Sequence, residues 1–149
     1  MHRGSSRPAS RARRLLVALA AALLAACAGG TSTPLVGTYW NVTQVGGDAF
    51  KPLKGGRDAH LRLDPQQNRA TGYSGVNSFA GSFETGASSL RFGPVAATRR
   101  AGPPAAMAFE ASLFKALEAT RSYRISGETL ELLDAAGAVR ARLEALPGL

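Results

Sequence analysis

Short stretches of alternating apolar and polar residues, separated by glycine and proline, constrain this chain more than any other feature. Ala59, Leu61 and Leu63 alternate with His60 and Arg62, which places the three apolar side chains on one face of a strand. The same pattern predicts strands over residues 38–45, 59–63, 69–76, 79–83, 90–92, 123–125, 130–132 and 139–145. Because tight turns join antiparallel strands and parallel strands need long crossovers, these segments predict an antiparallel sheet.

The period of the apolar residues changes after Pro103. Residues 104–120 are rich in helix-forming side chains, contain no glycine and begin with a proline that suits the first turn of a helix. The stripe that we expect to face the sheet is Met107, Ala111, Phe114 and Glu118, with Leu113 and Leu117 beside it. The sequence therefore predicts an α+β fold, in which an antiparallel sheet, open or partly closed into a barrel, is covered by one helix at about residues 104–120.

Residues 1–26 are organised like a bacterial secretion signal. Five arginines and no acid precede the twelve apolar residues of 15–26. As a helix, that stretch spans about 18 Å, which is too short for a hydrocarbon core of about 30 Å. The sequence Leu24-Ala25-Ala26-Cys27 resembles the lipobox of bacterial lipoproteins, whose cysteine becomes acylated. An ordinary secretion signal followed by an accidental cysteine is the alternative.

Lipidation of Cys27 implies a protein that stays on a membrane. Residues 27–34 then form the lipidated cysteine and a flexible tether, and residues 35–149 form the folded domain. Residue 28 is Ala rather than the Asp that resembles an inner-membrane retention signal. We therefore expect an outer membrane, with the domain facing the periplasm, or the outer surface of a cell with a single membrane.

Charge and residue usage exclude several classes of protein. The chain has 149 residues and a net charge of +8, but residues 27–149 carry 13 basic and 10 acidic side chains, a net charge of only +3. The basic excess therefore belongs to the N-terminus and does not indicate a nucleic-acid partner. One cysteine and two histidines do not make a Cys/His metal centre, so we expect no metal and no cofactor. We expect His60 on the solvent-facing side of its strand and without a catalytic role.

Several segments in a fixed order carry a family resemblance. They are Leu35-Val-Gly-Thr-Tyr-Trp-Asn-Val42, Gly75-Val-Asn77, Phe79-Ala-Gly81-Ser-Phe83, Leu90-Arg-Phe92-Gly-Pro94, Ala97-Thr98-Arg99 and Tyr123-Arg-Ile125-Ser-Gly127. Together they resemble the META domain, or HslJ-like, family over about residues 35–145. The resemblance implies a small β-rich domain with one helix. It also implies a non-enzymatic envelope lipoprotein linked to heat shock and to tolerance of antibiotics such as novobiocin.

One departure from the family pattern affects a pair of positions. Relatives usually carry cysteine where this chain has Val76 and Gly102. The joint loss is expected if the two cysteines of the relatives form a disulfide. Losing a disulfide costs about 2–5 kcal/mol, so other packing must compensate here. We therefore do not expect a redox or metal role that depends on that pair in this chain.

Four residues are candidate contacts for a ligand or partner: Asn77, Thr98, Arg99 and Glu110. Asn77 lies in a loop of small residues, where asparagine stabilises turns. Glu110 lies inside the apolar stretch of the predicted helix, where we expect an ion pair with Arg99 or hydrogen bonds from backbone N–H groups at the helix start. Thr98 and Arg99 belong to a small cationic patch that suits an anionic lipid surface.

Three functions are compatible with this sequence. The first is a non-enzymatic envelope lipoprotein that supports stress or antibiotic tolerance by binding a partner protein or a small amphipathic ligand. The second is an inhibitor of a lysozyme or protease, with the loop 72–81 or 93–103 entering the enzyme's cleft. The third is a hydrolase that uses Glu110 with Glu84 or Asp64, because glycoside hydrolysis needs two carboxylates about 5–9 Å apart.

Overall fold

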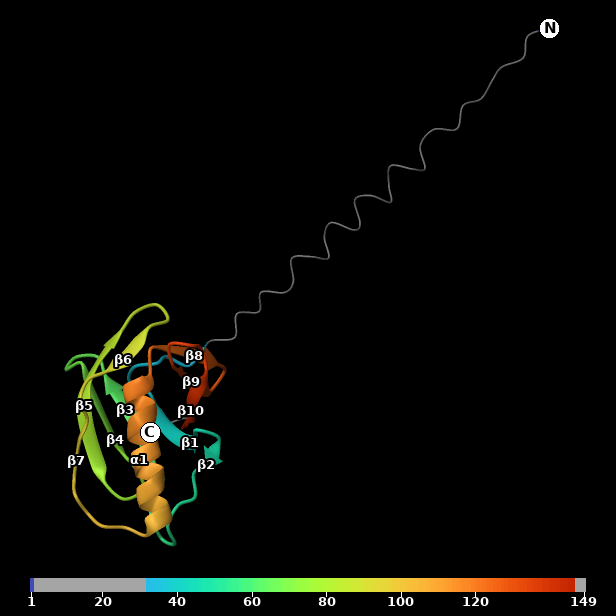
Figure 1. Cartoon of the computed structure of the whole chain (residues 1–149). Helices are drawn as coiled ribbons and strands as arrows, with labels where there is room; N and C mark the ends of the chain where they lie inside the picture. The colour runs from blue at the N-terminus through green and yellow to red at the C-terminus, as the bar shows by residue number, and fades with distance from the viewer. Residues whose placement is uncertain (2–31, 147–149) are drawn as a thin grey trace. The chain divides into compact units, whose positions relative to one another are not determined.

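The computed structural model describes Met1 and residues 32–146 (Figure 1). The chain divides into two units, Met1–Gly30 and Thr31–Leu149. The expected secretion signal beyond Met1, the expected acylation site Cys27 and the tether as far as residue 31 lie outside the described residues. Among the residues that are described, no helix is long and apolar enough to cross a membrane.

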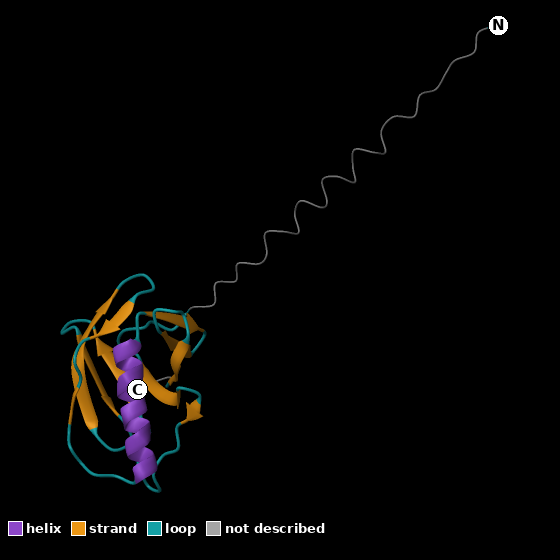
Figure 2. Ribbon diagram, in the orientation of Figure 1, coloured by secondary structure: helices purple, strands orange, loops and turns teal. Residues whose placement is uncertain are grey.

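Residues 32–146 form an antiparallel barrel that nearly closes, with one helix across it, which confirms the predicted α+β fold (Figure 2). The strands are β1 Tyr39–Val45, β2 Asp48–Ala49, β3 His60–Asp64, β4 Arg69–Tyr73, β5 Ser78–Thr85, β6 Leu90–Phe92, β7 Ala96–Ala97, β8 Ser122–Ser126, β9 Thr129–Leu133 and β10 Val139–Ala145. Their order is β6-β5-β4-β3-β1-β10-β9-β8, with β2 beside β1 and β7 beside β5. An isolated bridge between Ser89 and Ser122 brings the two edges of the sheet together.

The core of the barrel holds the apolar faces that the alternation predicts. Trp40, Val42 and Leu63 have no exposed surface, and the indole N–H of Trp40 donates to the carbonyl of Leu35 over 2.9 Å. Two strands, β2 and β7, are absent from the prediction because two residues are too few to show alternation. The strand predicted over 69–76 ends at Tyr73, where a tight turn begins.

The helix α1, Pro104–Ala119, runs across the barrel at the predicted place, but its buried stripe differs from the expected one. Its buried residues are Glu110, Leu113, Ala116 and Leu117. Ala111 and Glu118, which we expected on the buried stripe, are exposed. Leu113 and Leu117, which we expected beside the stripe, are its centre, and Glu110 belongs to it because the fold supplies this carboxyl with buried polar partners.

The two ends of the barrel have different contents. At one end residues 33–37 join it, where the N–H of Thr33 donates to the carbonyl of Gly127 and that of Gly37 donates to the carbonyl of Leu63. At the other end lie the β4–β5 turn and the start of α1 (Figure 1). This second end, which we call the cleft end, contains the turn 74–77 and the segments 48–58 and 98–103.

Candidate functional site

A turn of four residues, Ser74 to Asn77, joins β4 to β5 at the cleft end. The N–H of Ser74 donates to the carbonyl of Asn77 over 2.9 Å, and the N–H of Asn77 donates to the hydroxyl oxygen of Ser74 over 2.9 Å. Gly75 has a φ of 97°, a conformation that other residues adopt only under strain. Ser74 and Asn77 are each 1% exposed, so this turn is part of the interior of the protein.

The side chain of Asn77 links three segments that are distant in the sequence. Its amide nitrogen donates to the carbonyl of Arg100 over 3.1 Å and to the carboxyl oxygens of Glu110 over 3.1 and 3.0 Å. Its amide oxygen accepts from the hydroxyl of Thr98 and from the N–H of Arg100, both over 2.8 Å. All the hydrogen-bonding capacity of this amide is therefore used inside the protein, and Asn77 holds the turn, the 98–100 segment and α1 together.

Glu110 is buried, with 8% of its surface exposed, and its carboxyl group has neutral partners. The hydroxyl of Ser74 donates to it over 2.5 Å, and the amide of Asn77 donates to both of its oxygens. The expected ion pair with Arg99 is wrong, because the side chain of Arg99 is exposed and forms no ion pair within the described residues. The expected hydrogen bonds from N–H groups at the helix start to Glu110 are also absent within the described residues. Side chains of the β4–β5 turn bind its carboxyl group instead.

The structure thus brings together three of the four candidate contact residues, Asn77, Thr98 and Glu110, and leaves Arg99 on the surface nearby. Sequence reasoning missed Ser74, which completes the cluster. We call Ser74, Asn77 and Glu110 the buried polar cluster. A role of the four candidates in contacting a ligand or partner stays a prediction.

The two positions at which relatives carry cysteine lie against each other beside this cluster. A Cβ on Gly102 would lie 2.9 Å from one methyl carbon of Val76 and 3.0 Å from the other. The contact is what a disulfide between these positions requires in relatives. In this chain the methyl groups of Val76, which is 7% exposed, occupy the space that a bridge would fill.

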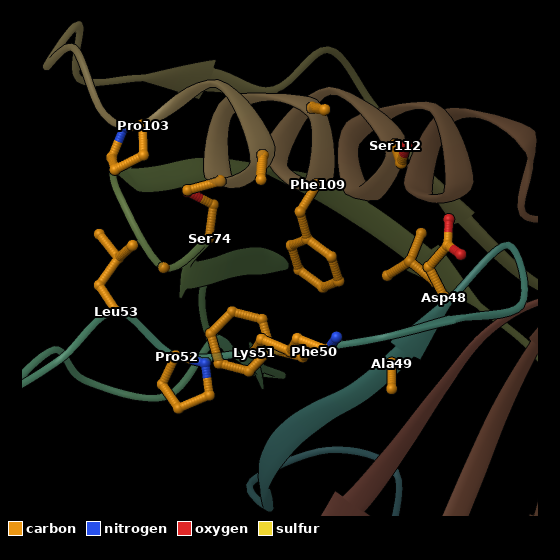
Figure 3. Close-up of a pocket in the computed structure, with 15 residues that line it drawn as sticks. Asp48, Ala49, Phe50, Lys51, Pro52, Leu53, Ser74, Pro103, Phe109 and Ser112 are labelled. Atoms are coloured by element: carbon orange, nitrogen blue, oxygen red, sulfur yellow. The ribbon is translucent and has the colours of Figure 1, made fainter.

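A cleft of about 570 Å³ opens next to the buried polar cluster (Figure 3). Its walls are the segment 48–53, the turn residues Ser74 and Gly75, and one side of the first half of α1 from Pro103 to Ser112. Most of its lining is apolar: Val45, Ala49, Phe50, Pro52, Leu53, Ala105, Ala106, Ala108 and Phe109. The volume and the apolar lining are typical of sites that take a small organic ligand.

Two aromatic rings form the centre of the cleft. Phe109 extends from α1 toward Phe50, and the centroids of their rings are 4.9 Å apart (Figure 3). Neither ring is fully buried, so both present apolar surface to the cleft. Leu53 and Pro103 lie at one end of the cleft, and Asp48 and Ser112 lie at the other (Figure 3). Sequence reasoning missed Phe50 and Phe109, although an aromatic residue in the polar, glycine-containing segment 48–58 was a usable indication.

The carboxylates that a glycoside hydrolase would need are far apart. Glu110 contacts Ser74, whereas Asp64 pairs with Arg69 at the opposite end of β4, about 16 Å away along the strand. Glu84 is seven residues along β5 from Asn77, or about 23 Å. Both separations exceed the 5–9 Å range of paired catalytic carboxylates, so the hydrolase hypothesis is wrong for these pairs. No group of three or more metal-binding side chains is found among the described residues.

The loop 72–81 also differs from its expected role in an inhibitor. Its tip is the buried turn 74–77, and Gly72, Tyr73 and 78–81 belong to β4 and β5. It therefore does not project into solvent, and no enzyme cleft could take it without unfolding. The loop 93–103 is largely exposed, but no feature of its geometry favours an enzyme as its partner.

His60 lies on the outer face of the sheet as expected, but it is half-buried there. Its ring stacks on Tyr39 at 4.4 Å, and Arg57 lies 4.4 Å over the neighbouring ring of Tyr73. Burial, and secondarily the positive charge of Arg57, lower the pKa of His60, against the opposing effect of a hydrogen bond to the carbonyl of Asp58. A second hollow of about 530 Å³, which we call the outer hollow, borders His60 between Arg69 and Thr98.

Comparisons with known proteins agree with this architecture. The family model of the META domain matches residues 33–146. A solved NMR structure of a protein from Burkholderia xenovorans is 22% identical and has a TM-score of 0.61, with 76% of this chain and 85% of that chain covered. A second protein with an NMR structure is 15% identical and has a TM-score of 0.56, with 72% of this chain and 87% of that chain covered. At these identities the two structures show the fold alone. No curated protein matches the chain with significance.

Proposed function

The chain belongs to the META domain family, and from that premise we propose that it is a binding module that holds a small amphipathic ligand in the cleft between α1 and the segment 48–53. The observation that carries the proposal is the cleft itself. It combines facing phenyl rings with a few polar lining side chains, among them Asp48, Lys51 and Ser112, which matches a ligand that has an apolar body and a polar group.

The walls of the cleft are held in place before any ligand arrives. The buried polar cluster fixes the β4–β5 turn against α1, and Asn77 fixes the 98–100 segment against both. The conformational entropy of ordering these walls is therefore lost during folding and not on binding, which raises the affinity for a ligand. In this account Glu110 and Asn77 position the walls, and the ligand contacts Phe50 and Phe109.

The proposed activity is binding without chemical change. The carboxyl of Glu110 is enclosed by Ser74 and Asn77, and the other candidate carboxylates lie at the far end of the strands. Support for a non-enzymatic role therefore comes from the separation of the groups that catalysis would have to bring together.

We further propose that Cys27 anchors the protein in the bacterial envelope by acyl chains, with the domain facing the periplasm from an outer membrane. The lipobox-like sequence before Cys27 supports the anchor, and a role in stress or antibiotic tolerance is what the family resemblance implies. Residues 33–37 join the barrel at the end opposite the cleft. This arrangement suits a tethered domain that presents its cleft away from its point of attachment.

Filling the cleft tests the binding proposal. Ala108 and Ala111 are both exposed on α1, but only Ala108 lines the cleft. We expect Ala108→Trp to weaken binding of the neutral fluorescent amphiphile N-phenyl-1-naphthylamine at least tenfold, an effect of about 1.4 kcal/mol, whereas Ala111→Trp leaves binding unchanged. Equal binding by both variants, with unchanged melting temperatures, would contradict the proposal.

A separate experiment tests the anchor. Cys27→Ala should move the protein from the membrane fraction to the soluble fraction and remove the mass of the acyl chains. A variant that stays with the membrane, or a wild-type protein whose mass shows residues 1–26 intact, would contradict lipidation.

A further inference from the structure

We propose that the ligand of the cleft is an anionic amphiphile, with a carboxylate or phosphate head group that lies at the Leu53–Pro103 end. This inference rests on the proposed binding function and adds the chemistry of the ligand. Its basis is the distribution of charge around the cleft.

The cleft end carries most of the net positive charge of the domain. Segments 48–58 and 98–103 contain five cations, Lys51, Lys54, Arg57, Arg99 and Arg100, and two acids, Asp48 and Asp58. Glu110 beside the cleft is a third acid, so this end carries a formal +2 of the +3 that residues 27–149 carry as a whole. Charges elsewhere in those residues sum to only +1, and the field of the domain is focused where the cleft opens.

Four of the five cations at the cleft end, all except Arg57, which lies over the ring of Tyr73, are available to a ligand. Within the described part of the chain the ion pairs are Arg124–Glu131, Arg142–Glu131 and Arg140–Asp134, and all of them lie on β8, β9, β10 or the turn after β9. None involves a cation of segments 48–58 or 98–103. An anionic head group would therefore meet positive side chains without first displacing an acid from them.

The charges also set the direction of the ligand. Asp48 lies with Ser112 at one end of the cleft, where it repels an anion (Figure 3). At the other end, Leu53 continues into Lys54, and Pro103 follows closely after Arg99 and Arg100. Lys51 also lines the cleft, with its amine nitrogen near the middle of it beside Phe50 (Figure 3). The head group is thus drawn toward Leu53 and Pro103, and the apolar tail lies along Phe50 and Phe109 toward Asp48.

The start of α1 adds to the same field. Pro103 supplies no side-chain cap, the first turn contains no acid, and Ala105 and Ala106 line the cleft. The partial positive charge of a helix N-terminus favours an anion nearby. The helix N-terminus adds to the attraction that the cationic side chains exert on an anion, and alone it would attract an anion only weakly.

A series of amphiphiles with one tail and three head groups tests the inference. The probes are dodecyl phosphate, dodecyl maltoside and dodecyltrimethylammonium, each below its micelle concentration, titrated into the mature chain that carries Cys27→Ala. We expect the phosphate to bind about tenfold more tightly than the maltoside, and the ammonium to bind most weakly. Added salt should lower the affinity for dodecyl phosphate and leave the affinity for dodecyl maltoside nearly unchanged.

Charge variants locate the head group. Lys51→Glu should lower the affinity for dodecyl phosphate about fivefold and leave the affinity for dodecyl maltoside unchanged. Asp48→Asn should raise the affinity for dodecyl phosphate. Lys115→Glu is the matched control, because Lys115 is exposed on α1 outside the cleft, and it should change neither probe.

The outcomes separate the two proposals. Equal affinity for all three probes, each blocked by Ala108→Trp, would overturn the anionic head group and leave the binding site standing. Equal effects of Lys51→Glu and Lys115→Glu would also overturn it, because they would show a response to net charge alone. Binding of none of the probes would overturn the proposed function and this inference with it.

Discussion

Two carboxyl groups are each the centre of a side-chain cluster, and they differ in burial and in the charge of their partners. Glu110 is buried and accepts hydrogen bonds from the uncharged side chains of Ser74 and Asn77. Glu131 lies on the outside of the barrel and pairs with Arg124 and Arg142. The hydrogen bond from Arg124, together with the second one from Arg142, lowers the pKa of Glu131.

The difference shows where a carboxyl group contributes to this fold. Around Glu131 the arginines are 62% and 45% exposed, and water replaces the ion pairs at little cost. Glu110 is only 8% exposed, so water replaces its partners poorly and a lost partner leaves a buried polar group unsatisfied. The cluster without a full opposite charge is therefore the one that holds the cleft end together.

Removing Asn77 should have the largest effect. Asn77→Ala leaves the carboxyl of Glu110 with the hydroxyl of Ser74 alone and removes the side-chain partner of the backbone of Arg100, and we expect the free energy of unfolding to fall by about 4 kcal/mol. The matched control is Asn41→Ala, because the buried Oδ1 of Asn41 has no hydrogen-bond partner in the described region. That variant should change stability by less than about 1 kcal/mol in urea unfolding. Equal losses in both variants would contradict the importance of the cluster.

The two carboxyl groups can be compared directly by the same substitution. Glu110→Ala should cost about 3 kcal/mol, because the hydroxyl of Ser74 and the amide of Asn77 lose a buried acceptor. Glu131→Ala should cost less than about 1 kcal/mol at neutral pH. Since the pKa of Glu131 is lowered, its contribution is present above its ordinary pKa of 4.5 and is lost as the pH falls below that value. The measurement is the melting temperature of both variants at pH 7. A lower melting temperature for Glu131→Ala than for Glu110→Ala would contradict the comparison.

A disulfide beside the buried polar cluster should strengthen the cleft end. Val76→Cys with Gly102→Cys closes a loop of about 25 residues, for which loop entropy gives about 3.5 kcal/mol. We expect a gain of about 2 kcal/mol, because a Cβ at Gly102 must settle against position 76. The measurement is the melting temperature with and without reductant in a Cys27→Ala background. A pair that stays reduced in air would show that the two segments are held farther apart than described.

The smallest expected effect concerns pH and the outer face. Burial lowers the pKa of His60, so the unfolded chain binds a proton more readily than the folded one as the pH falls below the ordinary value of 6.5. Stability should therefore decrease as the pH falls from 6.5 through the lowered pKa of His60. His60→Gln should remove this slope in urea titrations taken across that range. A wild-type protein whose stability rises on acidification there would contradict the stacked position of His60.

The strands were predictable from the sequence because alternation reports directly on burial. Leu61 and Leu63 face the core and Arg62 faces solvent, as a period of two requires. The short strands β2 and β7 were not predictable, because they exist through pairing with β1 and β5 rather than through their own pattern.

The candidate site was predictable only in part. Asn77 and Glu110 stand out as a polar residue among glycines and an acid in an apolar stretch, and the structure joins them. Their partner Ser74 could not be found, because the contact between residues 74 and 110 depends on how α1 lies against the β4–β5 turn. The cleft was missed for the same reason, since Phe50 and Phe109 meet only in the folded chain.

The central claim is that a ligand occupies the cleft between α1 and the segment 48–53, and backbone amide shifts in an NMR titration test it most directly. With dodecyl phosphate, we predict that the shifts concentrate at Phe50, Leu53, Gly75 and Phe109. Shifts that gather instead at Thr71 and Ala80 of the outer hollow, with the cleft residues unmoved, would contradict the account.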